Sequence, residues 1–234
     1  MSRSTRSILA LAAMLILPTL LSAQGETEKS RAVAGGGISA KGWMGKVDAK
    51  EAAAGLTLEN AKLASEGSDL RVTTGPATTY WSTANAAKGD YTVTATFTEP
   101  AYMSINSHPH PYGVVIAGND MGTDNASFLY CAAYGNGSFI VRGFGPAAFA
   151  LNGGRGAADP AVNKAAGVGQ PVTQEIALSV KGDKVECAIN GKVVASYAKA
   201  DLLVAGKLKS TDGVYGIRFA HNTDAIVKGL KLSK

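Results

Sequence analysis

The sequence contains few charged, aromatic and cysteine residues for its 234 positions. Charged side chains make up 18% and aromatic ones 7%, and there are only two cysteines. The low charge disfavours a coiled coil or a highly charged disordered chain. The 28 glycines follow no three-residue period, which excludes collagen. A hydrophobic content of 46% at this length indicates one sizeable domain, or at most two small ones.

Long hydrophobic runs are also scarce, and the one candidate lies near the start of the chain. Ile8–Leu21 is apolar over about 14 residues, whereas a membrane span needs roughly 20. Arg3 and Arg6 precede this run and the small residue Ala23 follows it. This layout is typical of a secretory signal peptide, and an uncleaved anchor is the alternative. The sequence therefore predicts a signal peptide over residues 1–23, export to the periplasm or beyond the cell, and no membrane span after cleavage.

The positive charge of the chain is small once this segment is removed. The formal net charge is +5, and removal of residues 1–23 leaves 21 basic and 18 acidic side chains, a net charge of +3. The basic residues are dispersed, and aromatic residues are not interleaved with them as they are on nucleic-acid-binding surfaces. We therefore expect no nucleic-acid partner.

The two cysteines of an exported chain could form one disulfide bond. Cys131 and Cys187 both lie in segments that read as strands. The alternative is a pair of buried, unbonded cysteines that pack as small hydrophobic residues. We favour this alternative, because a protein of this size has a core large enough to fold without a covalent link.

The remaining chain divides into a leader and one domain. Residues 24–42 are small, polar and glycine-rich, which predicts a flexible leader. The domain then spans residues 43–234. Its only good helix-forming run is Lys50–Ala54, which Gly55 would end, so we expect one short helix near its N-terminal side.

From residue 61 onward the hydrophobic pattern has a period of two. In Tyr91–Thr98, apolar residues alternate with threonines, as in a strand with one buried face. Asn190–Gly191 and Gly135–Gly137 each separate two such segments and predict tight hairpin turns. The fold class is therefore all-β, an antiparallel sandwich or barrel. Residues 145–171 lack this pattern, and such a long loop is a candidate rim for a site.

Several strings occur in an order that resembles a known family: Gly113–Gly118, the Asn136–Gly137 hairpin, Val185–Gly191 and Gly213–Phe219. They resemble the concanavalin A-like lectin and glucanase sandwich, most closely secreted laminin-G-like domains grouped with 3-keto-disaccharide hydrolases. The resemblance covers roughly residues 66–234 and implies a jelly-roll β-sandwich with a glycan site on its concave face.

The upstream strings Trp43–Gly45, Thr73–Pro76 and Tyr80–Trp81 look like a group of uncharacterised bacterial secreted proteins. That similarity implies no activity.

Catalytic motifs are missing. Retaining glucanases of this fold carry a Glu-x-Asp-x-Glu run that projects two carboxylates to one face, and this sequence has none. Asp183 and Glu186 are three residues apart and would face opposite sides of a continuous strand. There is no Gly-x-Ser-x-Gly nucleophile elbow either. These absences argue against hydrolysis, although two acids could still come from different strands.

A carbohydrate site needs aromatic faces for sugar rings and planar polar groups for hydroxyls, inside a concave surface. The sequence offers a small set of candidate ligand-binding residues: Trp81, Tyr112, Arg142, Arg218 and His221. Arg142 alternates with apolar neighbours along its predicted strand, which suggests either a ligand contact or a pair with an acid. For each candidate the alternative is an ordinary core aromatic residue or a salt bridge.

Two segments contain potential metal ligands. Residues 119–125 concentrate oxygen donors, and Asp120 and Asp124 could hold a structural calcium ion, although a polar turn is the simpler interpretation. His108 and His110 flank Pro109 and could share one side of an extended segment, with His221 as a third ligand. We favour a stiff segment with both histidines solvated, because no third ligand lies nearby in the sequence. No other cofactor is expected.

Three functions remain open at this stage. The leading hypothesis is an exported, non-catalytic β-sandwich that binds a carbohydrate or another extracellular polymer. The second is an enzyme acting on glycosides, as the resemblance implies. The third is a structural or protein-interaction module of the cell envelope whose edge strands pair with a partner. The oligomeric state is not predicted.

Overall fold

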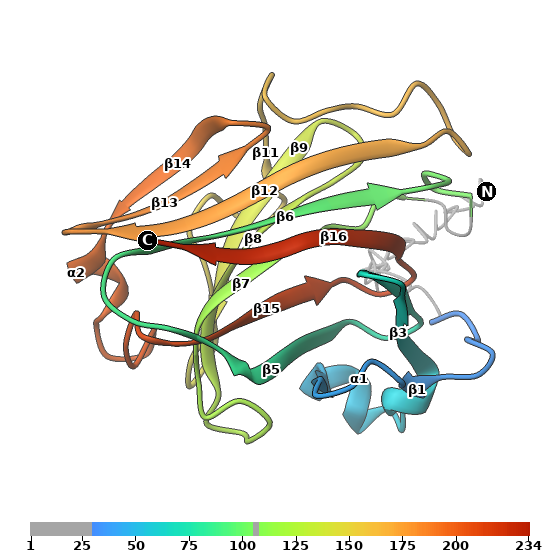
Figure 1. The fold of residues 1–234 in the computed structure, drawn as a ribbon, viewed down its shortest axis with the longest axis horizontal. Helices are drawn as coiled ribbons and strands as arrows, with labels where there is room; N and C mark the ends of the chain where they lie inside the picture. Colours follow the sequence, from blue (N-terminus) through green and yellow to red (C-terminus); the bar gives the residue numbers. More distant parts are fainter. Residues whose placement is uncertain (1–29, 105–107) are drawn as a thin grey trace, which may run out of the picture.

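Two twisted β-sheets pack face to face in the computed structural model, which describes residues 30–104 and 108–234 (Figure 1). Sheet A has the strand order β1 (Gly37–Ile38), β3 (Ala61–Glu66), β4 (Asp69–Thr74), β16 (Asp224–Ser233), β6 (Tyr91–Glu99), β12 (Val172–Lys181), β13 (Lys184–Ile189) and β14 (Lys192–Ala198). Sheet B has the order β10 (Ala148–Ala150), β9 (Ser138–Phe144), β8 (Ser127–Ala133), β7 (Tyr112–Asn119), β15 (Gly213–Phe219), β5 (Thr78–Ala87) and β2 (Met44–Val47), and β11 (Ala157–Ala158) pairs with β9. All pairs are antiparallel except β1 with β3, so the predicted antiparallel sandwich is confirmed.

Helical structure is limited to short elements. The expected N-terminal helix is present as α1 (Ala49–Ala53), and it is followed by the 3-10 turn η1 (Leu58–Asn60). A second short helix, α2 (Lys199–Leu202), was not predicted. None of the helices in the described residues is long and apolar enough to cross a membrane. The predicted signal peptide lies outside the described residues.

The period-two pattern of the sequence matches the alternation of buried and more exposed side chains along the strands. In β6, Tyr91, Val93, Ala95 and Phe97 are buried, whereas the intervening threonines are half-buried. The turn between β13 and β14 is formed by Asn190 and Gly191, both with positive φ, as the hairpin prediction requires.

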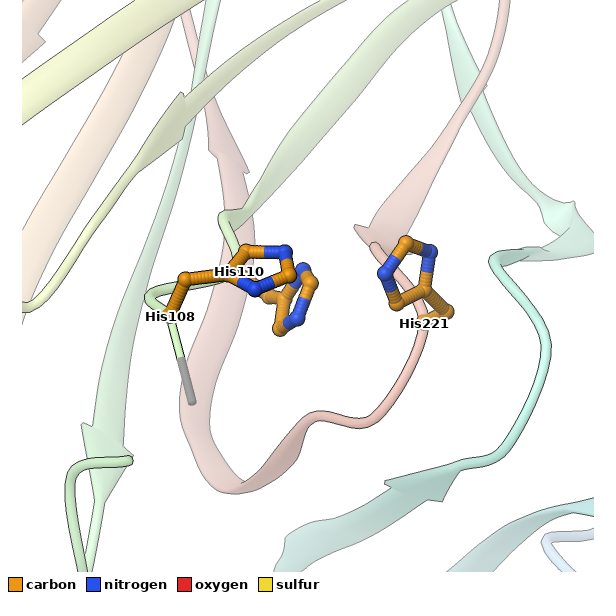
Figure 2. Close-up of side chains that lie close together, drawn as sticks. All are labelled: His108, His110 and His221. Carbon is orange, nitrogen blue, oxygen red and sulfur yellow. The ribbon is translucent and has the colours of Figure 1, made fainter. Parts of the chain in front are cut away.

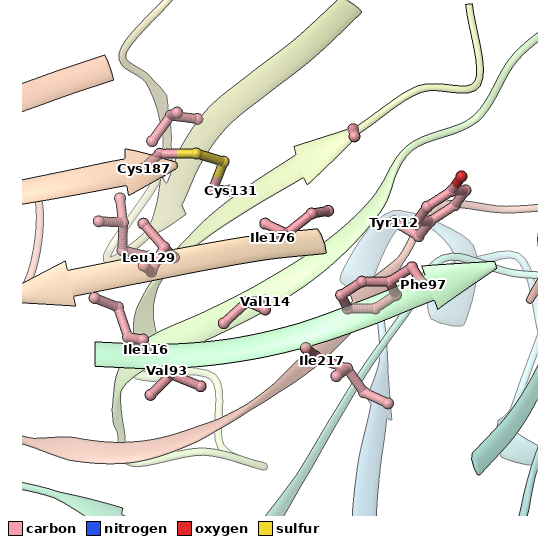
Figure 3. Close-up of a cluster of buried hydrophobic side chains, with 14 of the residues drawn as sticks. Val93, Phe97, Tyr112, Val114, Ile116, Leu129, Cys131, Ile176, Cys187 and Ile217 are labelled. Atoms are coloured by element: carbon pink, nitrogen blue, oxygen red, sulfur yellow. A yellow bond between two sulfur atoms is a disulfide. The ribbon is translucent and has the colours of Figure 1, made fainter. Parts of the chain in front are cut away.

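The core lies between the sheets and is formed by side chains from both of them. Sheet A contributes Val93, Phe97 and Ile176, and sheet B contributes Val114 and Ile217, all fully buried (Figure 3). Burial of apolar surface between the layers is the main source of stability in such a fold.

A disulfide bond between Cys131 on β8 and Cys187 on β13 links the two sheets (Figure 3). The preference for two unbonded cysteines was therefore wrong. Both side chains point into the core from opposite layers, and their Cα atoms are 6.1 Å apart, within the range that a disulfide requires. The sequence could not show this proximity because the two strands belong to different sheets.

Part of the segment predicted as a flexible leader lies against the sandwich. Within residues 30–42, β1 pairs with β3, and Arg31 donates hydrogen bonds to the carbonyl oxygens of Thr74 and Thr223 at 2.9 and 2.8 Å. The described part of the leader is therefore attached to sheet A. The long segment 145–171 also contributes to a sheet, because β10 and β11 both pair with β9.

Replacement of both cysteines by alanine should lower the free energy of unfolding by about 2–4 kcal/mol, because the cross-link restricts the unfolded chain. Urea denaturation of the wild type and of the Cys131→Ala/Cys187→Ala protein would measure the difference. A reducing agent should destabilise the wild type and leave the double variant unchanged. Two thiols titrated in the unfolded, unreduced wild type would contradict the cross-link.

Candidate functional site

The face of sheet B that is turned away from the core carries a second set of apolar side chains. Along β8, Leu129 and Cys131 point into the core, whereas Phe128 and Tyr130 point to the opposite side. We call this side the outer face of sheet B. Its apolar cluster consists of Val115, Phe128, Tyr130, Ala132 and Ile140, with Met121, Tyr134 and Phe144 packed against it. These residues are buried although they lie outside the sandwich core, so neighbouring segments must cover much of the face.

Among the residues that the structure describes, two hollows can be distinguished on the outer face. The larger, of about 350 Å³, is lined by Trp81, Phe128, Phe144 and the connection from β7 to β8; we call it the tryptophan hollow. The smaller, of about 260 Å³, is lined by three histidines with Tyr130, Tyr134, Arg142 and Arg218; we call it the histidine hollow. The tryptophan hollow is mainly apolar, whereas the histidine hollow combines aromatic rings with cationic and imidazole groups.

Arg218, which is buried, and Asp48, which is partly buried, form an ion pair between the two hollows. Nη1 and Nη2 of Arg218 donate to the two carboxylate oxygens of Asp48 at 2.8 and 2.6 Å, and Nη1 also donates to Oγ1 of Thr79 at 2.8 Å. Asp48 lines the tryptophan hollow and Arg218 lines the histidine hollow. The pair therefore belongs to the wall between them.

The Arg218 guanidinium is also held by aromatic rings. It lies 4.9 Å from the ring centre of Tyr130 and 4.8 Å from that of Phe144, within the range of cation–π attraction. Burial alone would lower the pKa of Arg218, but the Asp48 carboxylate raises that pKa above its usual value. Arg218 is thus a fixed cation whose position is set by its neighbours. For Arg218, sequence analysis gave a salt bridge as the alternative to a ligand contact, and the structure has such a bridge to Asp48.

The start of the short helix α1 supplies two carboxylates to this region, one for Arg218 and one for His221. Asp48 immediately precedes α1 and Glu51 lies in its first turn, three residues later and on the same side. One oxygen of Glu51 accepts a hydrogen bond from the backbone N–H of Ala77, and the other lies 3.5 Å from Nδ1 of His221. Sequence analysis missed both acids. Their position at the start of the one expected helix was a signal, but Arg218 and His221 are about 170 residues away in the chain.

All three histidines of the chain meet at the histidine hollow (Figure 2). Their ring centres are 4.3 Å apart for His108 and His110, 4.1 Å for His110 and His221, and 6.2 Å for His108 and His221. One nitrogen from each ring can be chosen so that all three lie within 4.8 Å of one another. His110 is only 7% exposed, so the interpretation of two solvated histidines was wrong for this residue.

The pairing of two strands explains why these histidines meet. β7 and β15 are antiparallel with Tyr112 opposite Phe219, and the backbone N–H of Ala220 donates to the carbonyl oxygen of Pro111 at 3.0 Å. His110 precedes Tyr112 by two residues, and His221 follows Phe219 by two. The register therefore places the two histidines beside each other at one end of the strand pair.

The other candidate ligand residues, Arg142, Trp81 and Tyr112, lie in three different parts of the structure. Arg142 lines the histidine hollow and donates to the carbonyl oxygen of Gly154, and its buried Nε has no hydrogen-bond partner in the described residues. Trp81 lines the tryptophan hollow. Tyr112 is fully buried on the core side of β7, where burial and then the nearby Glu99 carboxylate raise its pKa well above the usual value. Tyr112 is therefore not on the face that carries the hollows.

Asp120 and Asp124 lie in the connection between β7 and β8, and each contacts a lysine. Lys209 pairs with Asp120, and Nζ of Lys46 lies 3.0 Å from Oδ1 of Asp124, whose side chain is fully exposed. The structure thus gives each carboxylate a cationic partner. The calcium site stays a prediction.

Comparison with known proteins identifies the fold. No protein-family model and no curated protein matches the sequence. Among solved structures, carbohydrate-binding module CBM66 from Bacillus subtilis superposes with a TM-score of 0.52 at 10% identity, over 85% of this chain and 99% of that one. The fold is the concanavalin A-like, galectin-like β-sandwich.

Two further structures share this sandwich. A Bacillus subtilis protein of unknown function with a galectin-like fold gives a TM-score of 0.53 at 13% identity, over 81% of this chain and 88% of that one. Endo-β-1,3-glucanase from Pyrococcus furiosus gives 0.53 at 12% identity, over 85% and 90% of the two chains. At these identities the likeness establishes the sandwich fold and leaves activity to be argued from the site.

Replacement of Asp48 by alanine should lower the free energy of unfolding by roughly 2–4 kcal/mol, because it leaves the Arg218 cation buried without its partner. Asp48 is one-quarter exposed, so water offsets part of the full cost of a broken buried pair. Asp124→Ala is the matched control, since it removes a fully exposed carboxylate from its lysine. Urea denaturation should show a lower midpoint for Asp48→Ala than for the wild type. The control should keep the wild-type midpoint. Equal midpoints for both variants would show that the Arg218 pair does not support the fold.

Proposed function

We propose that this protein binds carbohydrate in the histidine hollow on the outer face of sheet B. One observation carries the proposal: a single hollow combines the rings of Tyr130 and Tyr134 with the side chains of Arg142 and His221. Aromatic rings offer flat apolar surfaces to the C–H face of a sugar. Guanidinium and imidazole groups offer directed donors to its hydroxyl oxygens. The combination suits a ligand with one apolar face and a polar edge.

The fold supports the same proposal. One of the similar solved structures is a carbohydrate-binding module and another is an endo-β-1,3-glucanase, and both share the sandwich at TM-scores above 0.5. The same sandwich therefore occurs in a carbohydrate-binding module and in a glucanase. The resemblance found in the sequence points in the same direction.

We infer binding without hydrolysis from the surroundings of the hollow. A retaining glycosidase needs two carboxyl groups about 5 Å apart across the scissile bond. The described residues that line the histidine hollow include no Asp or Glu. The two carboxylates at the start of α1 have other partners, since Asp48 pairs with Arg218, and Glu51 accepts from Ala77 and faces His221. This arrangement supports a binding role.

We also propose that the protein is exported. The pattern of Arg3, Arg6 and Ile8–Leu21 supports this. The link between Cys131 and Cys187 adds support, because disulfide bonds persist mainly in oxidising compartments.

A glycan array followed by calorimetry with the best ligand would test the binding proposal. Arg142→Gln should weaken binding by about tenfold or more, because a hydrogen bond to a charged group contributes roughly 1.5–3 kcal/mol. Arg155→Gln is the matched control: it alters an exposed arginine of the neighbouring loop that lines neither hollow, and it should bind like the wild type.

Three outcomes would contradict the binding proposal. If no glycan binds and none raises the melting temperature, the carbohydrate proposal fails. Release of reducing sugar that a single carboxylate substitution abolishes would replace it with a hydrolase. Dimers in solution without any response to sugar would favour an interaction module instead.

Export has its own test, the mass of the mature protein. The chain recovered from the periplasm or the medium should begin at Gln24 and contain the intact disulfide. A full-length chain retained inside the cell would contradict export.

A further inference from the structure

We propose that His108, His110 and His221 bind one zinc-type divalent transition-metal ion at the histidine hollow. The proposal involves only the protein and the ion, so it can be tested independently of carbohydrate binding. It rests on the convergence of the three imidazoles, on the carboxylate behind one of them and on the hollow that all three line.

The first argument is the distance between the possible ligand atoms. Zinc binds imidazole nitrogen at about 2.0–2.1 Å, so two nitrogens of a tetrahedral site lie roughly 3.4 Å apart. In the structure, one nitrogen from each ring lies within 4.8 Å of the other two. Closure around an ion therefore requires movements of roughly 1 Å, which small rotations of the side chains can provide.

The second argument is the carboxylate that faces His221. Oε1 of Glu51 lies 3.5 Å from Nδ1 of His221, and the other carboxylate oxygen of Glu51 accepts a hydrogen bond from the backbone N–H of Ala77. In metal sites, a ligating histidine usually donates its second ring nitrogen to a carboxylate or a carbonyl oxygen. Glu51 thus sets Nδ1 of His221 toward itself and leaves Nε2 as the ligand atom. It is a positioning residue rather than a ligand.

The third argument is the rigidity of the backbone that carries the ligands. Pro109 and Pro111 flank His110, and their fixed φ angles limit the conformations of this segment. The N–H of Ala220 donates to Pro111, so the segment that carries His221 is fastened to the segment that carries the other two histidines. Less conformational entropy is lost on metal binding when the ligands are already held close together.

Three protein ligands leave one tetrahedral position for a water molecule or for an oxygen of a bound molecule. The three histidines line the same hollow as Arg142 and Arg218. The fourth position therefore has access to the space in which a ligand of the hollow would lie. An oxygen donor such as a hydroxyl or a carboxylate suits both the ion and the neighbouring guanidinium groups.

The test uses the full protein without a polyhistidine tag, because its own three histidines are the proposed ligands. After treatment with a chelator and dialysis, zinc uptake is measured by calorimetry and by competition with a chromophoric chelator. Cobalt(II) reports the ligand geometry through its visible absorption. We expect one ion per chain and a cobalt spectrum typical of a four- or five-coordinate site.

Variants then assign the site. His108→Ala is the most informative, because His108 is exposed and its replacement should leave the fold intact. Glu51→Gln should weaken zinc binding by roughly 10–100-fold, as the loss of an outer-shell partner does elsewhere. His108→Ala and His221→Ala should weaken it further, since each removes a ligand.

Asp124→Ala is the control, because Asp124 belongs to the calcium site predicted from the sequence and lies outside the histidine cluster. This variant should bind zinc like the wild type. Circular dichroism confirms that each variant is folded. Failure of the wild type to take up zinc would overturn the proposal. Uptake that persists unchanged in His108→Ala and His221→Ala would overturn it as well, because the ion would then be bound elsewhere. No sugar is present in these measurements, so a negative result leaves the carbohydrate proposal untouched.

Discussion

Strands β7 and β15 lie side by side in the middle of sheet B, with Tyr112 opposite Phe219. Both of these aromatic residues point into the core, where their rings contact Phe97 of the facing sheet. Because side chains alternate along a strand, the same register that buries Phe219 sends Arg218 to the outer face. It also brings the segments just beyond the strand ends together, and with them the histidines. A shift of one residue would reverse both faces, so the core and the candidate site depend on a single strand alignment.

The outer face of sheet B carries a buried charge because its neighbours satisfy that charge. Arg218 has Asp48 on one side and the rings of Tyr130 and Phe144 close to its guanidinium. A buried ion pair contributes little net stability compared with apolar packing, but it fixes geometry. Here it ties the start of α1 to sheet B. That attachment also positions Glu51 beside His221, so the segment that starts α1 lines the tryptophan hollow through Asp48 and contacts Arg218 and His221 of the histidine hollow.

Local features of the fold could be predicted from the sequence, and long-range ones could not. The alternation in Tyr91–Thr98 and the Asn190–Gly191 turn are decided by neighbouring residues, and both were predicted correctly. The link between Cys131 and Cys187 depends on which strands face each other across the core.

The candidate site shows the same division. Arg142, Arg218 and His221 were chosen from the sequence and line one hollow, whereas Trp81 lines the other and Tyr112 is buried in the core. The alternation of a strand identifies two faces but does not say which of them is the core. The gathering of all three histidines depends on a strand pairing between segments more than 100 residues apart, which no local pattern reveals.

The most direct test of the histidine hollow as the ligand site is NMR spectroscopy of the histidine side chains. The chain has only three imidazoles and all of them line this hollow, so long-range ¹H–¹⁵N correlation spectra report on it without interference. Titration with a bound glycan should shift the imidazole signals in step with the binding isotherm. Saturating glycan that leaves all three imidazole signals in place would contradict the assignment and place the ligand elsewhere on the sandwich.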